Sequence, residues 1–379
     1  MRTANEMVRM SDVMPFGKHP RQLVRDARWF NSGPPPELVR DHAVTPTELF
    51  FTRNHAAVPP VDPESYRLTV DGLVERSLSL SLEHLRRSYP VTTVPATIAC
   101  AGLRRDELMR IRPIPGEVAW GAEPISNGVW RGVRLARVLE TAGIRPEAEH
   151  AQFTGLDDVE REGKRFGFGA SIPVSKAMAE ETLLAWEMNG EPLPPVHGFP
   201  LRVVVPGYIG ARSVKWLTNI HLQTAPTENY FQSHAYRMFP PDVDASTVVW
   251  DQGVALSDVP LNSVIWSPQA DAQLLQGRVM VSGWACASCG RTIERVEVTS
   301  DQGKQWHRAQ LSNSGNPWSW TLWQVELTLT AGPHVLTARA WDSAGNTQPE
   351  SPAPIWNFKG YMNNAWHRVQ VTVEGPATR

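Results

Sequence analysis

The stretch Val94-Pro-Ala-Thr-Ile-Ala-Cys100-Ala-Gly-Leu-Arg-Arg105 decides how this chain is interpreted. Its apolar first half is rich in residues that favour strands, and the glycine after Cys100 is typical of a turn. We therefore expect a buried strand that ends in a loop, with Cys100 at the junction. A thiolate is a good metal ligand, and the two adjacent guanidinium groups would stabilise it and attract anions. A buried free cysteine that only fills space is the alternative interpretation at this point.

The composition limits the classes of protein to which the chain can belong. Its 379 residues exceed what one core usually serves, so we expect two domains. A net charge of −2 argues against nucleic acid as a partner. No apolar run is long enough to cross a membrane, so no membrane partner is expected. The polar first residues lack the apolar core of a secretory signal, which predicts a cytoplasmic location, and a periplasmic one only if a signal has been removed.

Helix and strand signals are mixed without regular alternation in the first two thirds of the chain. Leu135–Ala142 places its apolar residues on one helical face, and Leu201–Val205 is typical of a buried strand. Asn189-Gly190 between two apolar runs predicts a hairpin. Together these patterns predict an α+β domain over residues 46–250. The polar, proline-broken residues 1–45 are expected to form an arm that wraps over it.

The pattern changes after about residue 250 to short alternating runs separated by turns. The clearest runs are Arg278–Trp284, Ile293–Thr299, Trp320–Leu327, His334–Trp341 and His367–Val373. Several such strands without a helix signal predict an all-β, immunoglobulin-like sandwich over residues 251–379.

The pair Cys286-Ala-Ser-Cys289 lies between two of these runs. Its spacing suits half of a zinc site or a redox pair. Since the sequence has no second such pair and no adjacent histidine, we interpret it as a loop with incidental cysteines.

Cys100-Ala-Gly-x-Arg-Arg105 resembles the molybdenum-ligand motif of the sulfite oxidase family. Further motifs that are similar to those of the family follow in order over residues 45–375: Arg53-Asn54-His55, Phe153–Asp157, His197–Arg202, Gly210–Leu217, Tyr236–Pro241 and Trp356–Arg368. The resemblance implies a mixed α+β molybdopterin-binding domain followed by an immunoglobulin-like dimerisation domain, and therefore a homodimer. It also implies the oxidation of sulfite to sulfate at a dioxo-molybdenum centre.

The resemblance implies roles in catalysis for residues at matched positions. Cys100 would be the protein thiolate on molybdenum, a soft ligand that suits this metal. Arg53 and Arg105 would bind sulfite, because guanidinium groups hold small anions well. Trp120 would form a wall of the substrate pocket, and Tyr236 would hydrogen-bond to the substrate or to a metal oxygen. Ordinary ion pairing and packing are the alternative explanations for these residues.

The same resemblance implies a set of residues around the molybdopterin cofactor. They are Phe51, Arg53, Asn54, His55, Cys100, Asp157, His197, Arg202, Ser213, Val214 and Lys215. Cations in this set suit the phosphate of the cofactor, and a carboxylate suits the N–H donors of the pterin.

Three positions depart from the family pattern. Leu103 stands where the family usually has Asn, and Ala235 where an Asp commonly precedes the tyrosine. Lys359 stands where an Arg is expected, and it would supply charge to the anion site without the planar fork of a guanidinium. The sequence leaves two orientations of Lys359 open, into the anion pocket or out to solvent.

The resemblance leaves alternatives for the reaction. The sequence has no haem-attachment CxxCH, so electrons would pass to oxygen or to a separate carrier such as cytochrome c. A nitrate reductase-like enzyme, a sulfane dehydrogenase subunit and a non-catalytic relative of the fold are the competing hypotheses. The retained Cys100 argues against the last of these.

Overall fold

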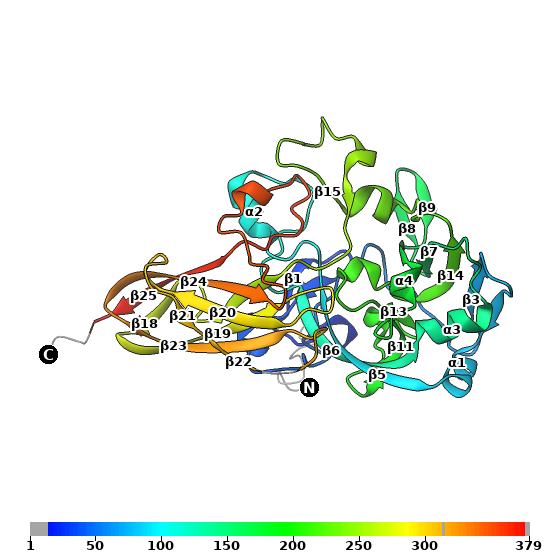
Figure 1. Cartoon of the computed structure of the whole chain (residues 1–379), viewed down its shortest axis with the longest axis horizontal. Helices are drawn as coiled ribbons and strands as arrows, with labels where there is room; N and C mark the ends of the chain where they lie inside the picture. Colours follow the sequence, from blue (N-terminus) through cyan, green and yellow to red (C-terminus); the bar gives the residue numbers. More distant parts are fainter. Residues whose placement is uncertain (1–13, 313–314, 376–379) are drawn as a thin grey trace, which may run out of the picture.

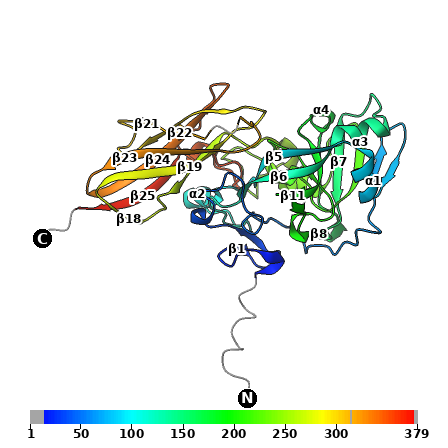
Figure 2. The same ribbon diagram turned by 90° about the horizontal axis from the view of Figure 1, so that it is seen from below.

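The computed structural model describes residues 14–312 and 315–375. Figures 1 and 2 show two regions side by side: a mixed region of helices and strands, and an elongated all-strand region that carries the C-terminal end of the chain. This arrangement confirms the predicted fold class. Among the described residues, no helix is long and apolar enough to cross a membrane.

The mixed region contains two main sheets. The first has the order β10-β7-β14-β3-β4, formed by Gly169–Pro173, His150–Gly155, Leu217–Gln223, Leu68–Gly72 and Leu78–Leu80. The second has the order β12-β11-β6-β5, formed by Glu191–Pro192, Leu183–Met188, Ile125–Arg134 and Val91–Ala99, and β13 (Arg202–Val204) pairs with β11. The helices are α1 (Leu82–Ser88), α2 (Arg105–Ile111), α3 (Leu135–Ala142) and α4 (Val174–Ala177). Because β5 ends at Ala99 and α2 begins at Arg105, the Cys100 loop joins this sheet to a helix.

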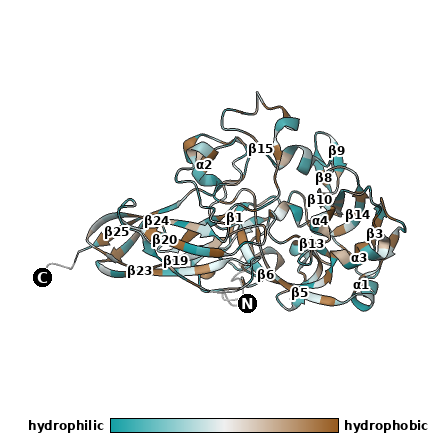
Figure 3. Ribbon diagram, viewed as in Figure 1, coloured by the Kyte–Doolittle hydropathy of each residue, from teal (hydrophilic) through white to brown (hydrophobic). Residues whose placement is uncertain are grey.

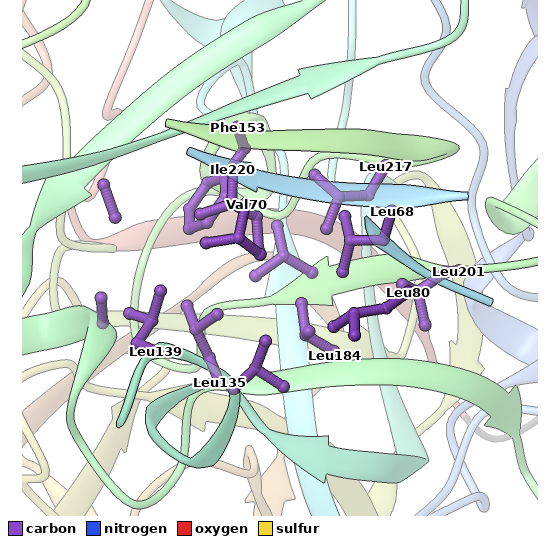
Figure 4. Packing of buried hydrophobic residues seen from close by; sticks show 14 of the residues in the cluster. Leu68, Val70, Leu80, Leu135, Leu139, Phe153, Leu184, Leu201, Leu217 and Ile220 are labelled. Carbon is purple, nitrogen blue, oxygen red and sulfur yellow. The ribbon is translucent and has the colours of Figure 1, made fainter. Parts of the chain in front are cut away.

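The core of this region lies between the first sheet and the elements that face it (Figure 4). Leu68, Val70 and Phe153 on the sheet face Leu135 and Leu184, and all five side chains are completely buried. Burial of each such side chain stabilises the fold by about 1.5–3 kcal/mol.

Two local predictions are confirmed within this core. The predicted helix is α3, and Gly143 ends it with a φ of +73°. In the predicted hairpin, Met188 pairs with Glu191, and Asn189 and Gly190 have φ values of +54° and +86°. Two positive φ values in sequence are what a type I′ turn requires.

The C-terminal region is a sandwich of two sheets. One has the order β17-β19-β23-β22, formed by Asn262–Ser267, Gly277–Cys286, Thr321–Leu329 and Gln310–Leu311. The other has the order β18-β25-β24-β20-β21, formed by Ala272–Leu275, His367–Glu374, Gly332–Asp342, Ile293–Thr299 and His307–Arg308. Hydrophobic and hydrophilic residues alternate along these strands (Figure 3), which explains why the sequence pattern identifies them.

The segment Cys286–Cys289 connects β19 to β20. Cys286 is buried, which raises the pKa of its thiol to about 12, whereas Cys289 is exposed and its Sγ lies 3.4 Å from Asp258 Oδ1. Both are free thiols.

The described part of the arm, residues 14–45, lies against the mixed region. It contains a short hairpin of β1 (Leu23–Asp26) and β2 (Asn31–Gly33). Arg25 pairs with the buried Glu123 at 2.6 Å, and the side chain of Asn31 accepts a hydrogen bond from the backbone of Asn54. Residues 1–13 of the predicted arm lie outside the described residues. The remaining short pairs are β8 with β9 (Val159–Arg161, Lys164–Phe166) and β15 with β16 (Arg237–Met238, Val254–Ala255).

Candidate active site

A single cavity brings together every residue that the sequence places around the cofactor. It is lined by Phe51, Arg53, Asn54, His55, Cys100, Asp157, His197, Arg202, Ser213, Val214 and Lys215, together with Tyr236. These residues come from segments far apart in the chain, so the fold assembles the set. Arg105, Trp120 and Lys359 are not among the residues that line this cavity.

Cys100 occupies the position that the strand-to-loop pattern predicts. It directly follows β5, its backbone N–H donates to Pro124 at 2.9 Å, and its side chain is 8% exposed. The N–H of Gly102 points at its sulfur over 3.4 Å. The thiol therefore lies in a hydrogen-bonded loop at the wall of the cavity, where a metal could reach it.

The two adjacent arginines point to different places. Arg104 has a φ of +60°, forms a bidentate ion pair with Glu107, and donates to Asn262 and to the carbonyl of Ala365 in the C-terminal region, each at 2.8 Å. It joins the two regions of the protein and does not line the cavity. The expectation that both guanidinium groups serve the thiolate is therefore wrong for Arg104, because the left-handed backbone turns its side chain away.

Arg105 packs directly on the Cys100 loop. A Cβ atom on Gly102 would come within 2.6 Å of its guanidinium, so a side chain at this position would displace the guanidinium. Its Nε donates to the carbonyls of Lys359 and Gly360 at 3.1 and 3.2 Å, and Nη1 donates to Val118 at 2.9 Å. These bonds fix Arg105 between the loop and the C-terminal segment.

Lys359 forms an ion pair with Glu117, a residue that sequence reasoning missed. The second oxygen of Glu117 lies 3.5 Å from Nη2 of Arg105. Burial raises the pKa of Glu117, but Arg105 and Lys359 outweigh this effect, so the net pKa is lowered and the carboxylate is charged. Lys359 therefore neither lies free in a pocket nor extends into solvent. No motif of the sequence includes Glu117, because folding brings its partners Arg105 and Lys359 to it.

Trp120 is completely buried among the aromatic and aliphatic side chains around Cys100. Its indole Nε1 has no hydrogen-bond partner within the described residues.

Tyr236 connects the cavity to the C-terminal segment. Its hydroxyl shares a 2.8 Å hydrogen bond with His55 Nε2, and its ring stacks on Tyr361 with centroids 5.4 Å apart. Burial raises the pKa of Tyr236, so the phenol is protonated at neutral pH. Burial, reinforced by Arg53, holds the pKa of His55 well below its usual value. A neutral imidazole and a neutral phenol are thus held together at the cavity wall.

Arg202 and Lys215 are buried cations whose hydrogen bonds, within the described residues, all go to neutral groups. Arg202 donates to the carbonyls of His197 and Ser213 at 3.0 Å each, and its Nε has no partner in the described part of the chain. Lys215 donates to the side chain of Asn54 and to a backbone carbonyl. Burial lowers the pKa of Arg202 to about 9 and that of Lys215 well below its usual value.

Buried cations without a counter-ion are costly, so this cavity is suited to an anionic group. The unpaired Nε of Arg202 and the lack of any carboxylate in ion-pair contact with Arg202 or Lys215, among the described residues, fit a phosphate. Asp157, which accepts a hydrogen bond from Phe168 and lines the same cavity, fits the N–H donors of a pterin. The donor set therefore suits the molybdopterin cofactor.

Comparisons with known proteins agree with this geometry. Residues 55–231 match the model of the oxidoreductase molybdopterin binding domain, and residues 254–374 match that of the Mo-co oxidoreductase dimerisation domain. Sulfite oxidase of Gallus gallus is 42% identical over 361 residues, covering 93% of this chain and 78% of that protein. This chain belongs to the sulfite oxidase family.

Two further relatives support membership of the family. Sulfite oxidase of Arabidopsis thaliana is 38% identical over 374 residues and covers 93% of this chain, which spans 94% of that protein. The structure of the sulfane dehydrogenase SoxCD from Paracoccus pantotrophus has a TM-score of 0.79 and 27% identity, covering 92% of this chain and 86% of that one. As a member of the family, the chain is a molybdopterin-dependent oxidoreductase. The roles of individual site residues and the domain boundaries at residues 45 and 250 stay predictions.

Proposed function

We propose that this protein oxidises sulfite to sulfate with a molybdenum–molybdopterin cofactor and acts as a homodimer. The observation that carries the proposal is a single cavity in which Cys100 lies together with buried cations that have no carboxylate partner. A cofactor that binds metal at one end and carries a phosphate at the other matches both features.

The cofactor supplies the two-electron redox chemistry when it is bound. Cys100 provides the protein thiolate for the metal, and Arg202 and Lys215 hold the phosphate. Asp157 would accept hydrogen bonds from the N–H donors of the pterin, and Ser213 and Val214 line the same cavity.

The substrate is oriented by the charged groups near Cys100. Arg53 and Arg105 attract the sulfite anion, and the phenol of Tyr236 donates a hydrogen bond to one of its oxygens. Trp120 excludes water from the apolar side of the Cys100 loop. Since Glu117 compensates part of the positive charge, the affinity of this site for an anion is moderated.

The proposal is tested by steady-state kinetics on the purified, cofactor-loaded dimer. Sulfite is offered with ferricyanide, cytochrome c and oxygen in parallel, because the acceptor is a separate question from the substrate. Nitrate with a reduced dye is the competing reaction. Sulfite-dependent reduction of at least one acceptor is expected. Turnover of nitrate but not of sulfite would overturn the proposal.

The homodimer is tested by light scattering at micromolar concentration. We expect twice the mass of the chain, with contacts from residue 260 onward, since a sandwich without catalytic residues needs another role and symmetric pairing is the commonest one. A monomeric mass would contradict this part of the proposal.

A further inference from the structure

Lys18, in the N-terminal arm, contacts residues that line the cofactor cavity. It lies outside residues 55–231, the part that matches the molybdopterin-binding domain. The side chain is buried, and its Nζ lies 2.7 Å from the carbonyl oxygens of Thr47 and Phe50 and 2.5 Å from Nε2 of His197. The arm therefore touches a residue that lines the cavity.

The chemistry of these three contacts fixes the position of a proton. An ammonium has three N–H donors and no lone pair, and the two carbonyls can only accept. When Lys18 is an ammonium, the third contact therefore requires Nε2 of His197 to be the acceptor. Burial and the neighbouring Lys18 hold the pKa of His197 well below its usual value, so the ring is neutral. Opposite an ammonium, the single proton of a neutral ring belongs on Nδ1, because Nε2 must accept.

The remaining nitrogen of His197 is available to a ligand. Within the described residues, Nδ1 has no hydrogen-bond partner, although the ring lines the cavity and packs edge-on against Phe50 at 5.3 Å. A ring fixed in this way presents an N–H donor. Burial lowers the pKa of Lys18 to about 7, and an anion in the cavity would raise it again, so the ammonium form is favoured when the cofactor is bound.

We propose that Lys18 is a positioning residue of the cofactor site: it holds His197 in the Nδ1–H tautomer, so that the ring donates a hydrogen bond to an acceptor atom of the molybdopterin. The N-terminal arm is then part of the cofactor site. This inference rests on the family's cofactor and is independent of the substrate.

The tautomer is measured directly by long-range ¹H–¹⁵N spectra of the full-length holoenzyme labelled at histidine. His197→Gln identifies the signal. We expect the Nδ1-protonated pattern in the wild type, its loss in Lys18→Met, and its retention in Lys18→Arg, which donates to the same nitrogen. An Nε2-protonated or doubly protonated ring in the wild type would overturn the inference without any variant.

Cofactor binding gives a second measurement. Pterin fluorescence per chain is measured after dilution and oxidative release. The affinity of the Lys18→Met protein for the cofactor is expected to fall on the order of tenfold. Gln22→Ala is the matched control, because Gln22 ties the same arm to the Glu48 carbonyl at 3.1 Å without reaching His197. Gln22→Ala and Lys18→Arg should retain the cofactor. An equal loss in Gln22→Ala would show that Lys18 only anchors the arm, and the inference would be wrong.

Discussion

The cofactor cavity and the charged cluster of Arg105, Glu117 and Lys359 differ in how their positive charges are compensated. In the cavity, Arg202 and Lys215 hydrogen-bond to neutral groups and form no ion pair within the part of the chain that the structure describes. In the cluster, Glu117 lies between Arg105 and Lys359 and pairs with both. The first arrangement favours a permanently bound anion, and in the proposed function the cofactor phosphate would fill this role. The second is balanced by itself through Glu117, so it needs no bound anion to compensate its buried charges.

The largest effect is expected from a change at Cys100, which lines the cavity and whose loop packs against Arg105. Cys100→Ser should leave a folded dimer that retains pterin but has sulfite turnover reduced to background. A hydroxyl is far harder to deprotonate than a thiol, so it is a poor replacement ligand. Pterin release and steady-state rates are measured on the same preparation. Turnover at the wild-type level would contradict the assignment of Cys100 as the metal ligand.

The balance in the charged cluster is tested by removing each partner separately. Lys359→Met should lower kcat/KM for sulfite on the order of tenfold to a hundredfold, because it leaves Glu117 to repel the anion. Glu117→Gln should lower the KM for sulfite. The kcat/KM of the double variant Lys359→Met, Glu117→Gln should lie between the values of the two single variants. Lys359→Arg should be tolerated.

A null result would have a clear meaning for Lys359. If Lys359→Met changes the kinetics by less than about twofold, Arg53 and Arg105 hold the substrate alone and Lys359 is not part of the site. Arg368 is not a substitute, since it binds the carbonyl of Glu350 instead.

The need for an anion in the cavity is tested by Arg202→Met. The affinity of the Arg202→Met protein for the cofactor should fall on the order of tenfold. The free energy of unfolding of the cofactor-free protein should change by less than about 1 kcal/mol, since the lost hydrogen bonds are offset by removal of an unpaired buried charge. Arg212→Met is the control, because Arg212 is an equally buried arginine that does not line the cavity. Equal loss of cofactor in Arg202→Met and Arg212→Met would contradict the view that the cavity binds an anion through Arg202.

The smallest effect is expected at Tyr236. Tyr236→Phe removes the hydroxyl that contacts His55 and leaves the stacking on Tyr361 intact. A neutral hydrogen bond contributes about 0.5–1.5 kcal/mol, so kcat/KM should fall roughly three- to tenfold. Cofactor content, measured in parallel, should stay at one per chain. A loss of cofactor instead of rate would place Tyr236 in the cofactor site.

The sequence by itself determined the features that depend on neighbouring residues. The end of the strand at Cys100, the helix before Gly143, the Asn189-Gly190 hairpin and the alternating strands of the sandwich all follow from local patterns, because backbone preferences act over a few residues. The resemblance then brought together a cofactor set that the fold gathers into one cavity.

Only the tertiary structure decided which charged groups face each other. Arg104 and Arg105 are adjacent and chemically identical, yet one joins the two regions and the other packs on the Cys100 loop. The partners Glu117 and Lys359, and likewise Lys18 and His197, are separated by well over a hundred residues. Because each pairing depends on where distant segments meet after folding, no local pattern contains it.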